Sequence, residues 1–175
     1  MGTAGLKLRY YGDPVLRRRA EDVTVFDASL RGAADAMVDT MRDEEGVGLA
    51  APQVGIEQRL LVALEMRTPD DDDAAPITMV NPEITGRSRE TWVFEEGCLS
   101  IPGIRGDVTR PLQVRVRFLD LDGREHSVDA EGMFARILQH EIDHLDGKLF
   151  IDYLSPAEKM LIKTRLKKLA QRSED

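Results

Sequence analysis

Two of the three histidines in this chain lie four residues apart, and a glutamate directly follows the first of them. The segment reads His140-Glu141-Ile142-Asp143-His144. On a helix, residues i and i+4 share one face, so both imidazoles can bind the same metal ion. The glutamate would project beside that ion, where it can act as a general base. The pattern predicts a metal-dependent hydrolytic site; the alternative is a solvated helix with two incidental histidines.

Two imidazoles leave a tetrahedral ion short of ligands, because a catalytic site needs a third protein ligand and an open position for water. The six residues after His144 contain no histidine, which excludes the third-histidine pattern of metzincins. His126 is a candidate, but it falls in a predicted strand among charged residues, and we expect it to be exposed. Cys98, the only cysteine, is the better candidate, although a lone cysteine is often just a small buried hydrophobe.

A third feature is the segment Gly46–Gln53, which contains two glycines and two alanines and ends in a polar amide. Small residues let a backbone run close to another surface, so this segment could line a site with Gln53 as its polar group. The alternative is a helix C-cap followed by an ordinary packed loop.

Hydrophobic periodicity and turn residues predict the elements that must position these groups. We expect helices over Asp27–Glu45, over Gly132–Asp146 with the histidine motif, and over Pro156–Arg172 with Ser155 as N-cap. We expect strands at Arg59–Met66, Ile77–Val80, Glu83–Phe94, Leu112–Leu121 and Glu125–Ala130, a hairpin turn at Asp122-Gly123, and an exposed loop over Pro69–Pro76. Strands outnumber helices and do not alternate with them, which favours an α+β fold over a doubly wound sheet.

The composition, with 42% hydrophobic and 32% charged residues among 175, is typical of a globular protein. We expect one domain over residues 1–175, with a basic helix over 154–175. The net charge of −8 argues against DNA and anionic membranes as partners. A single cysteine cannot form an internal disulfide, and Met1–Tyr11 lacks the apolar core of a signal peptide. We therefore expect a cytoplasmic protein, and a monomer because no apolar surface stripe stands out.

Three motifs occur in one order along the chain: Gly46-x-Gly-Leu-Ala-Ala-Pro-Gln53, Glu96-Gly-Cys-Leu-Ser100 and Gln139-His-Glu-x-Asp-His-Leu-x-Gly147. Together they resemble the signature of bacterial peptide deformylases. The likeness extends to Gly12–Leu16, Asn81-Pro82, Ser100–Gly103 and Arg110-Pro111, and so covers the chain from residue 12 to about residue 155. It implies short antiparallel strands around a central HExxH helix. It also implies a metallohydrolase that removes the formyl group from the N-terminal formyl-methionine of new polypeptides, releasing formate. Because no transit extension precedes the matched region, we expect a bacterial rather than an organellar protein.

The resemblance implies that Cys98, His140 and His144 are the metal ligands and that Glu141 is the base. It also implies a supporting ion pair between Glu96 and Arg110. A thiolate and two imidazoles suit zinc, but iron(II), nickel or cobalt can occupy such a site. The family favours Fe(2+) as the native ion.

The resemblance also implies how the substrate is held. It assigns stabilisation of the tetrahedral oxyanion to the Gln53 side chain and the Leu99 backbone N–H. The backbone at Gly48 would bind the substrate peptide, because a side chain there would block the approach. Arg105 resembles an arginine that contacts the substrate backbone.

A pocket for methionine is expected beside the ligands. Met133 and Ile137 share a helix face with the histidines by their spacing. The family comparison adds Val47 and Phe94 as further walls. The alternative is that Met133 and Ile137 are ordinary core residues.

Three other functions fit parts of the pattern. A zinc protease would need a downstream third ligand, which does not appear. A cysteine hydrolase could use Cys98 as nucleophile and His140 as base, and a chelator should spare such an enzyme. A metal-stabilised binding module would need neither Glu141 nor Gln53, so both residues argue against it.

The last predicted helix, Pro156–Arg172, carries six basic residues and one acidic residue. We expect four apolar residues to dock it on the domain with the basic residues outward, namely Met160, Leu161, Leu166 and Leu169. It could be a solvated helix whose cations complement its own dipole. It could instead contact ribosomal RNA near emerging chains, as suggested for some members of the family that the chain resembles.

Overall fold

The computed structural model describes residues 5–174, which form three helices, seven strands and three short 3-10 helices. The helices are α1 (Ala28–Asp43), α2 (Gly132–Leu145) and α3 (Pro156–Arg172). The strands are β1 (Gly48–Ala50), β2 (Leu60–Leu64), β3 (Pro76–Arg87), β4 (Thr91–Cys98), β5 (Ile101–Pro111), β6 (Gln113–Leu119) and β7 (Glu125–Glu131). The 3-10 helices are η1 (Pro14–Arg17), η2 (Ala51–Val54) and η3 (Phe150–Tyr153). Residues 1–4 and 175 lie outside the described residues. The expectations for Met1–Tyr11 and for a domain over 1–175 include these positions, and to that extent they also lie outside the described residues.

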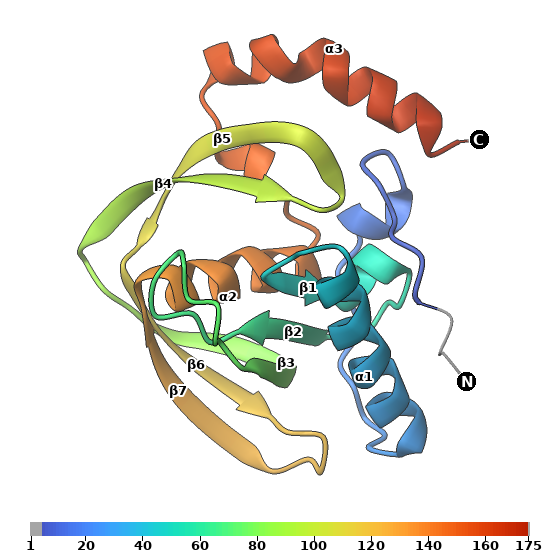
Figure 1. The fold of residues 1–175 in the computed structure, drawn as a ribbon, viewed down its shortest axis with the longest axis vertical. Helices are drawn as coiled ribbons and strands as arrows, with labels where there is room; N and C mark the ends of the chain where they lie inside the picture. The colour runs from blue at the N-terminus through green and yellow to red at the C-terminus, as the bar shows by residue number, and fades with distance from the viewer. Residues whose placement is uncertain (1–4, 175) are drawn as a thin grey trace.

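Every pairing between these strands is antiparallel. Five strands form one sheet in the order β1-β2-β3-β6-β7, while β4 and β5 form a separate two-stranded sheet. Helix α2 runs between the two sheets, and α1 lies beside β1 and β2 (Figure 1). The predicted α+β class and the three predicted helices are confirmed.

The helix that carries the histidine motif is held by its apolar face. Leu138, Ile142 and Leu145 of α2 are buried in one core cluster with Leu61 of β2 and Val116 of β6. Their spacing of four and three residues places them on one face. Each fully buried side chain of this size contributes about 1.5–3 kcal/mol to stability. This packing fixes the histidines relative to both sheets.

One strand prediction was wrong, and one strand was missed. The segment Glu83–Phe94, predicted as one strand, is divided, because a turn that includes Ser88 ends β3 at Arg87 and lets β4 begin at Thr91. The strand β5 was not predicted, because its glycines and charged residues lower its strand propensity. Its ladder with β4 supplies the pairing that its own sequence does not favour.

Helix α3 begins as predicted, with the Ser155 side chain accepting a hydrogen bond from the Glu158 N–H. Its predicted docking face was partly wrong, since Met160 is 77% and Leu161 79% exposed. Ile162 is buried instead, and Leu166 and Leu169 pack with it, at spacings of four and three residues that define the true buried face. Figure 1 shows α3 crossing the outer side of the β4–β5 hairpin. None of the helices over residues 5–174 is long and apolar enough to cross a membrane.

Candidate active site

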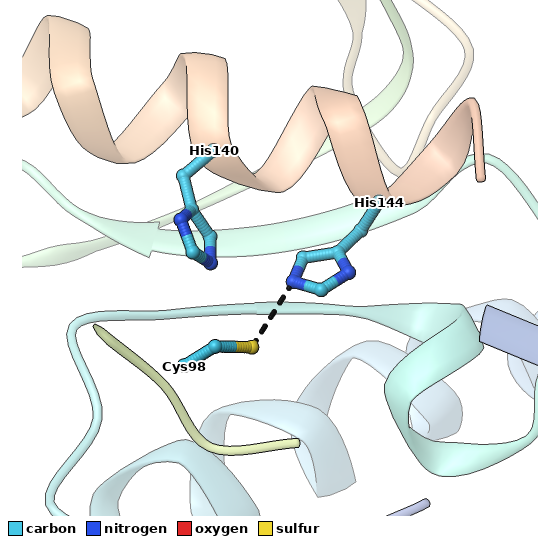
Figure 2. Close-up of side chains that lie close together, drawn as sticks. All are labelled: Cys98, His140 and His144. Atoms are coloured by element: carbon cyan, nitrogen blue, oxygen red, sulfur yellow. Dashed lines mark hydrogen bonds between the residues drawn. The ribbon is translucent and has the colours of Figure 1, made fainter. Parts of the chain in front are cut away.

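Cys98, His140 and His144 come together between the β4–β5 hairpin and α2. One potential ligand atom from each lies within 4.8 Å of the others. The Cys98 Sγ is 3.3 Å from the His144 Nε2. Figure 2 shows both imidazoles projecting from α2 toward the thiol. A thiol and two imidazoles at this separation match the soft and borderline donors that zinc and other transition metals take, so the residues fit a metal ion.

Glu141 lies beside this cluster and is 4% exposed. Its Oε2 atom is buried and has no hydrogen-bond partner among the described residues. Burial raises the pKa of Glu141 to about 7, because the low-dielectric surroundings disfavour the carboxylate. A carboxyl group that titrates near neutrality is suited to accept and return a proton.

Glu96 is the centre of a buried polar cluster behind the histidines. Its Oε1 lies 2.8 Å from the His140 Nδ1 and accepts a hydrogen bond from Arg110 Nη2 at 3.0 Å. Its Oε2 accepts from Arg110 Nε at 2.6 Å and from Arg136 Nη1 at 2.5 Å. Burial opposes ionisation, but the hydrogen bonds from His140 and Arg110 hold the pKa of Glu96 well below its usual range. These contacts fix the Glu96 carboxylate next to the His140 Nδ1.

The pKa of His144 is shifted differently from that of His140. Burial lowers the pKa of His144 well below its usual value, which favours the neutral form that binds metals. Burial acts the same way on His140, but contacts with Cys98 and Glu96 raise the pKa of that imidazole. Metal binding at His140 would therefore release a proton.

The side-chain amide of Gln53 is buried and faces the same cleft. Its Oε1 accepts a hydrogen bond from the Ala50 N–H at 2.9 Å. Its Nε2 donates to the Ser100 Oγ at 3.2 Å and lies 3.5 Å from the Cys98 Sγ. The amide nitrogen is thereby directed toward the cluster of Cys98, His140 and His144. Leu99 sits in the turn between β4 and β5, directly after the thiol.

A cavity of about 600 Å³ opens onto these groups. It brings together the apolar residues predicted for the methionine pocket, namely Val47, Phe94, Met133 and Ile137, with Gly48, Gln53, Cys98, Leu99, Arg105, His140 and Glu141. Ile137 is 3% exposed and also belongs to the main core, so lining a pocket and packing in the core are compatible here.

Two glycines of the cleft stand where side chains would collide with polar groups. A Cβ atom at Gly48 would lie 2.7 Å from the Glu141 Oε1. A Cβ atom at Gly97 would lie 2.9 Å from Arg105 Nη1, and Arg105 is held there by a 2.8 Å ion pair with Glu95. Glycine at position 48 therefore has two explanations. It would give a peptide access to the backbone, as expected from the sequence, and it leaves room for the Glu141 side chain.

His126 is not brought into the site. It lies on β7 with its side chain 48% exposed, and its Nε2 is 2.6 Å from Asp120 Oδ2. The expectation of an exposed strand histidine is confirmed.

Three residues that contact the site were given no role on the basis of the sequence. Arg136 contacts Glu96, and Ser100 contacts Gln53. Asp143 accepts a hydrogen bond from Arg110 Nη1 at 2.8 Å. Each has a local signal: Ser100 and Asp143 lie within the family motifs, and Arg136 lies four residues before His140, one turn away on the same helix.

Comparison with known proteins adds independent information. The profile of the polypeptide deformylase family matches residues 6–160. A peptide deformylase of Rhizobium meliloti strain 1021 is 45% identical over 159 residues, which cover 91% of this chain and 90% of that protein. A solved peptide deformylase from Legionella pneumophila superimposes with a TM-score of 0.86 at 43% identity, covering 98% of each chain. A plant peptide deformylase gives a TM-score of 0.91 at 37% identity, covering 99% of this chain and 94% of that one.

Proposed function

The chain belongs to the peptide deformylase family of metal-dependent hydrolases, which remove the N-formyl group from newly made polypeptides, and from this premise we propose which residues carry the activity. Cys98, His140 and His144 hold one divalent ion, and Glu141 is the general base. The observation that carries the proposal is the clustering of Cys98, His140 and His144 at one point, next to a cavity that Cys98, His140 and Glu141 line.

The chemistry requires water to attack the formyl carbon and the amine to leave with a proton. A bound divalent ion would supply a Lewis acid that lowers the pKa of water in the cleft. The Glu141 carboxylate removes a proton from the attacking water and returns it to the leaving nitrogen, so that formate and a free amino terminus result. The Gln53 amide and the Leu99 N–H donate hydrogen bonds to the oxyanion as it develops.

The substrate peptide binds along the edge of the last strand of a sheet. Strand β1 ends the order of its sheet, so the backbone at Gly48 can pair with an extended peptide. The methionine side chain enters the pocket formed by Val47, Phe94, Met133 and Ile137. Arg105 contacts the backbone of the peptide at the opposite side of the cleft.

Replacing the third ligand tests this assignment. Cys98→Ser offers a harder and weaker ligand, so metal content after mild chelation and formate release from a formyl-Met peptide should both fall sharply. The matched control is His126→Ala, which should keep both. A Cys98→Ser variant that retains its metal while His126→Ala loses it would assign the third ligand to His126.

The native ion is proposed to be Fe(2+), with Zn(2+), Ni(2+) and Co(2+) as competent substitutes. Anaerobic purification followed by metal analysis should find iron, with activity that declines on exposure to air. Zinc in stoichiometric amount and insensitivity to air would contradict this assignment.

The exposed basic face of α3 is proposed to contact ribosomal RNA. Its basic residues are Lys159, Lys163, Arg165, Lys167, Lys168 and Arg172, and all are exposed. Phosphate contacts of this kind weaken steeply with salt. Changing the four lysines to glutamine should abolish salt-sensitive co-sedimentation with ribosomes and leave hydrolysis of a short formyl-Met peptide intact. A double change of Arg87 and Arg89 to glutamine is the control.

The substrate also bears on location and assembly. Nascent formylated chains are made in the bacterial cytoplasm, so we place the enzyme there, and fractionation of cells should find it in that compartment. We also propose that it acts as a monomer. Sedimentation equilibrium at assay concentrations should give a mass near 19.6 kDa.

A further inference from the structure

Arg136 is a buried arginine of α2 that none of the roles above uses. Its side chain is 2% exposed, although an arginine at such depth is strongly disfavoured unless charges and hydrogen bonds compensate it. It also lines the cavity onto which two of the proposed ligands, Cys98 and His140, open. A charged residue in that position needs partners of its own.

The hairpin strands hold the Arg136 guanidinium in one orientation. Its Nη1 donates to the Val108 carbonyl oxygen at 2.9 Å, and its Nη2 donates to the Trp92 carbonyl oxygen at 2.8 Å. The guanidinium carbon also lies over the Trp92 ring, 4.8 Å from the centroid. Contacts with two strands and an aromatic face leave the side chain little freedom.

The remaining Arg136 contact reaches the carboxylate behind a proposed ligand. Its Nη1 also donates to Glu96 Oε2 at 2.5 Å, while the other oxygen of Glu96 lies 2.8 Å from the His140 Nδ1. Arg110 contacts both oxygens of the same carboxylate. Both arginines donate to this carboxylate, so its orientation toward His140 depends on both.

We propose that Arg136 is a positioning residue for the metal centre. It orients the Glu96 carboxylate, and through it the His140 imidazole, so that Nε2 faces the ion. The inference rests on the proposed ligand set of Cys98, His140 and His144.

The test measures zinc affinity by competing the zinc-loaded enzyme against a chromophoric chelator. Arg136→Met keeps similar volume but removes the charge and all the hydrogen bonds. Because an outer partner of a metal-binding histidine is lost, zinc affinity should fall about 10–100-fold. Arg115→Met is the matched control, since Arg115 is an exposed arginine of β6 that pairs with Asp129 of β7. The zinc affinity of this variant should equal that of the wild type.

A folded Arg136→Met variant with wild-type zinc affinity would overturn the proposal. If that variant does not fold, Arg136→Lys decides, because lysine keeps the charge but cannot reach two carbonyls and a carboxylate in one plane. Reduced zinc affinity in a folded Arg136→Lys supports the positioning role, and wild-type affinity overturns it.

A double variant separates this role from a general loss of stability. In a Glu96→Gln background, the further change of Arg136 to Met or Lys should lower zinc affinity by less than about threefold, because its effect acts through Glu96. Fully multiplicative losses would overturn the proposal. Cys98→Ser in the same competition tests the ligand set alone: unchanged affinity there would reject that set, whereas unchanged affinity only in the Arg136 variants would reject the positioning role.

Discussion

Two histidine–carboxylate pairs in this chain have nearly the same geometry and very different surroundings. His140 Nδ1 lies 2.8 Å from Glu96, and His126 Nε2 lies 2.6 Å from Asp120. In the first pair the side chains are 11% and 5% exposed, and in the second 48% and 31%. A short distance alone therefore does not distinguish a buried pair beside the proposed metal site from a pair on the surface.

What separates the two pairs is the set of partners around the carboxylate. Two buried arginines contact Glu96, and because water is excluded, losing any one partner leaves buried polar atoms without a hydrogen bond. The hydrogen bond with His126 lowers the pKa of Asp120 to about 2, but this carboxylate faces solvent, which screens the pair. We define the distal ladder as strands β3, β6 and β7. Removing a polar group should therefore change activity or metal affinity in the cleft, but not on the distal ladder.

The largest difference is expected for two glutamates. Glu141→Gln removes the proposed base but no ligand, so turnover should fall roughly 10²–10⁴-fold with metal content unchanged. Glu125→Gln, an exposed glutamate of β7, should leave formate release unaffected. Near-normal turnover by a metal-loaded Glu141→Gln variant would remove this residue from the mechanism.

Two glutamines give the second comparison. Gln53→Leu should lower kcat by about 10²–10³, the usual loss for one oxyanion donor, and leave metal content intact. Gln113→Leu, at an exposed position of β6, should change neither kcat nor KM. An effect of Gln53→Leu that is confined to KM would make Gln53 a substrate-binding residue instead.

Two glycines sharpen the comparison sterically. Gly48→Ala places a Cβ 2.7 Å from the Glu141 Oε1 and must displace that carboxylate, so kcat should fall by up to about 10² without loss of metal. Gly86→Ala on β3 meets only a Cβ atom of Arg115 at 3.6 Å, an ordinary contact, and should be neutral. Equal kinetics for both alanine variants would show that the cleft tolerates a side chain at Gly48.

The two histidine–carboxylate pairs provide the last comparison. Glu96→Gln should weaken zinc binding about 10–100-fold, because it removes the charged partner of His140, a proposed metal ligand. Asp120→Asn should leave zinc affinity at the wild-type value. Chelator competition measures both, and a similar loss in the two variants would show that burial does not decide which pair supports the metal.

Long-range pairing was the part of the fold that sequence patterns predicted least well. The division between β3 and β4 depends on a three-residue turn, and β5 has a composition that disfavours strands. In α3, apolar residues at Met160 and Leu161 suggested a docking face, yet Ile162 occupies it. Each of these features is decided by what packs against the segment, and that partner is distant in sequence.

The sequence by itself determined the local features of the site. The spacing of His140 and His144 on a helix, the N-cap at Ser155 and the amphipathic stripe of α2 follow from helical periodicity, which needs no information beyond neighbouring residues. Family motifs pointed to Cys98, but spacing alone left His126 as an alternative. Only the tertiary structure decided which carboxylate meets which imidazole, because the hairpin that carries Glu96 and the helix that carries His140 are joined by packing rather than by sequence proximity. The buried Arg136 belongs to this second class, since its role depends on carbonyl groups of two strands that the fold alone brings to it.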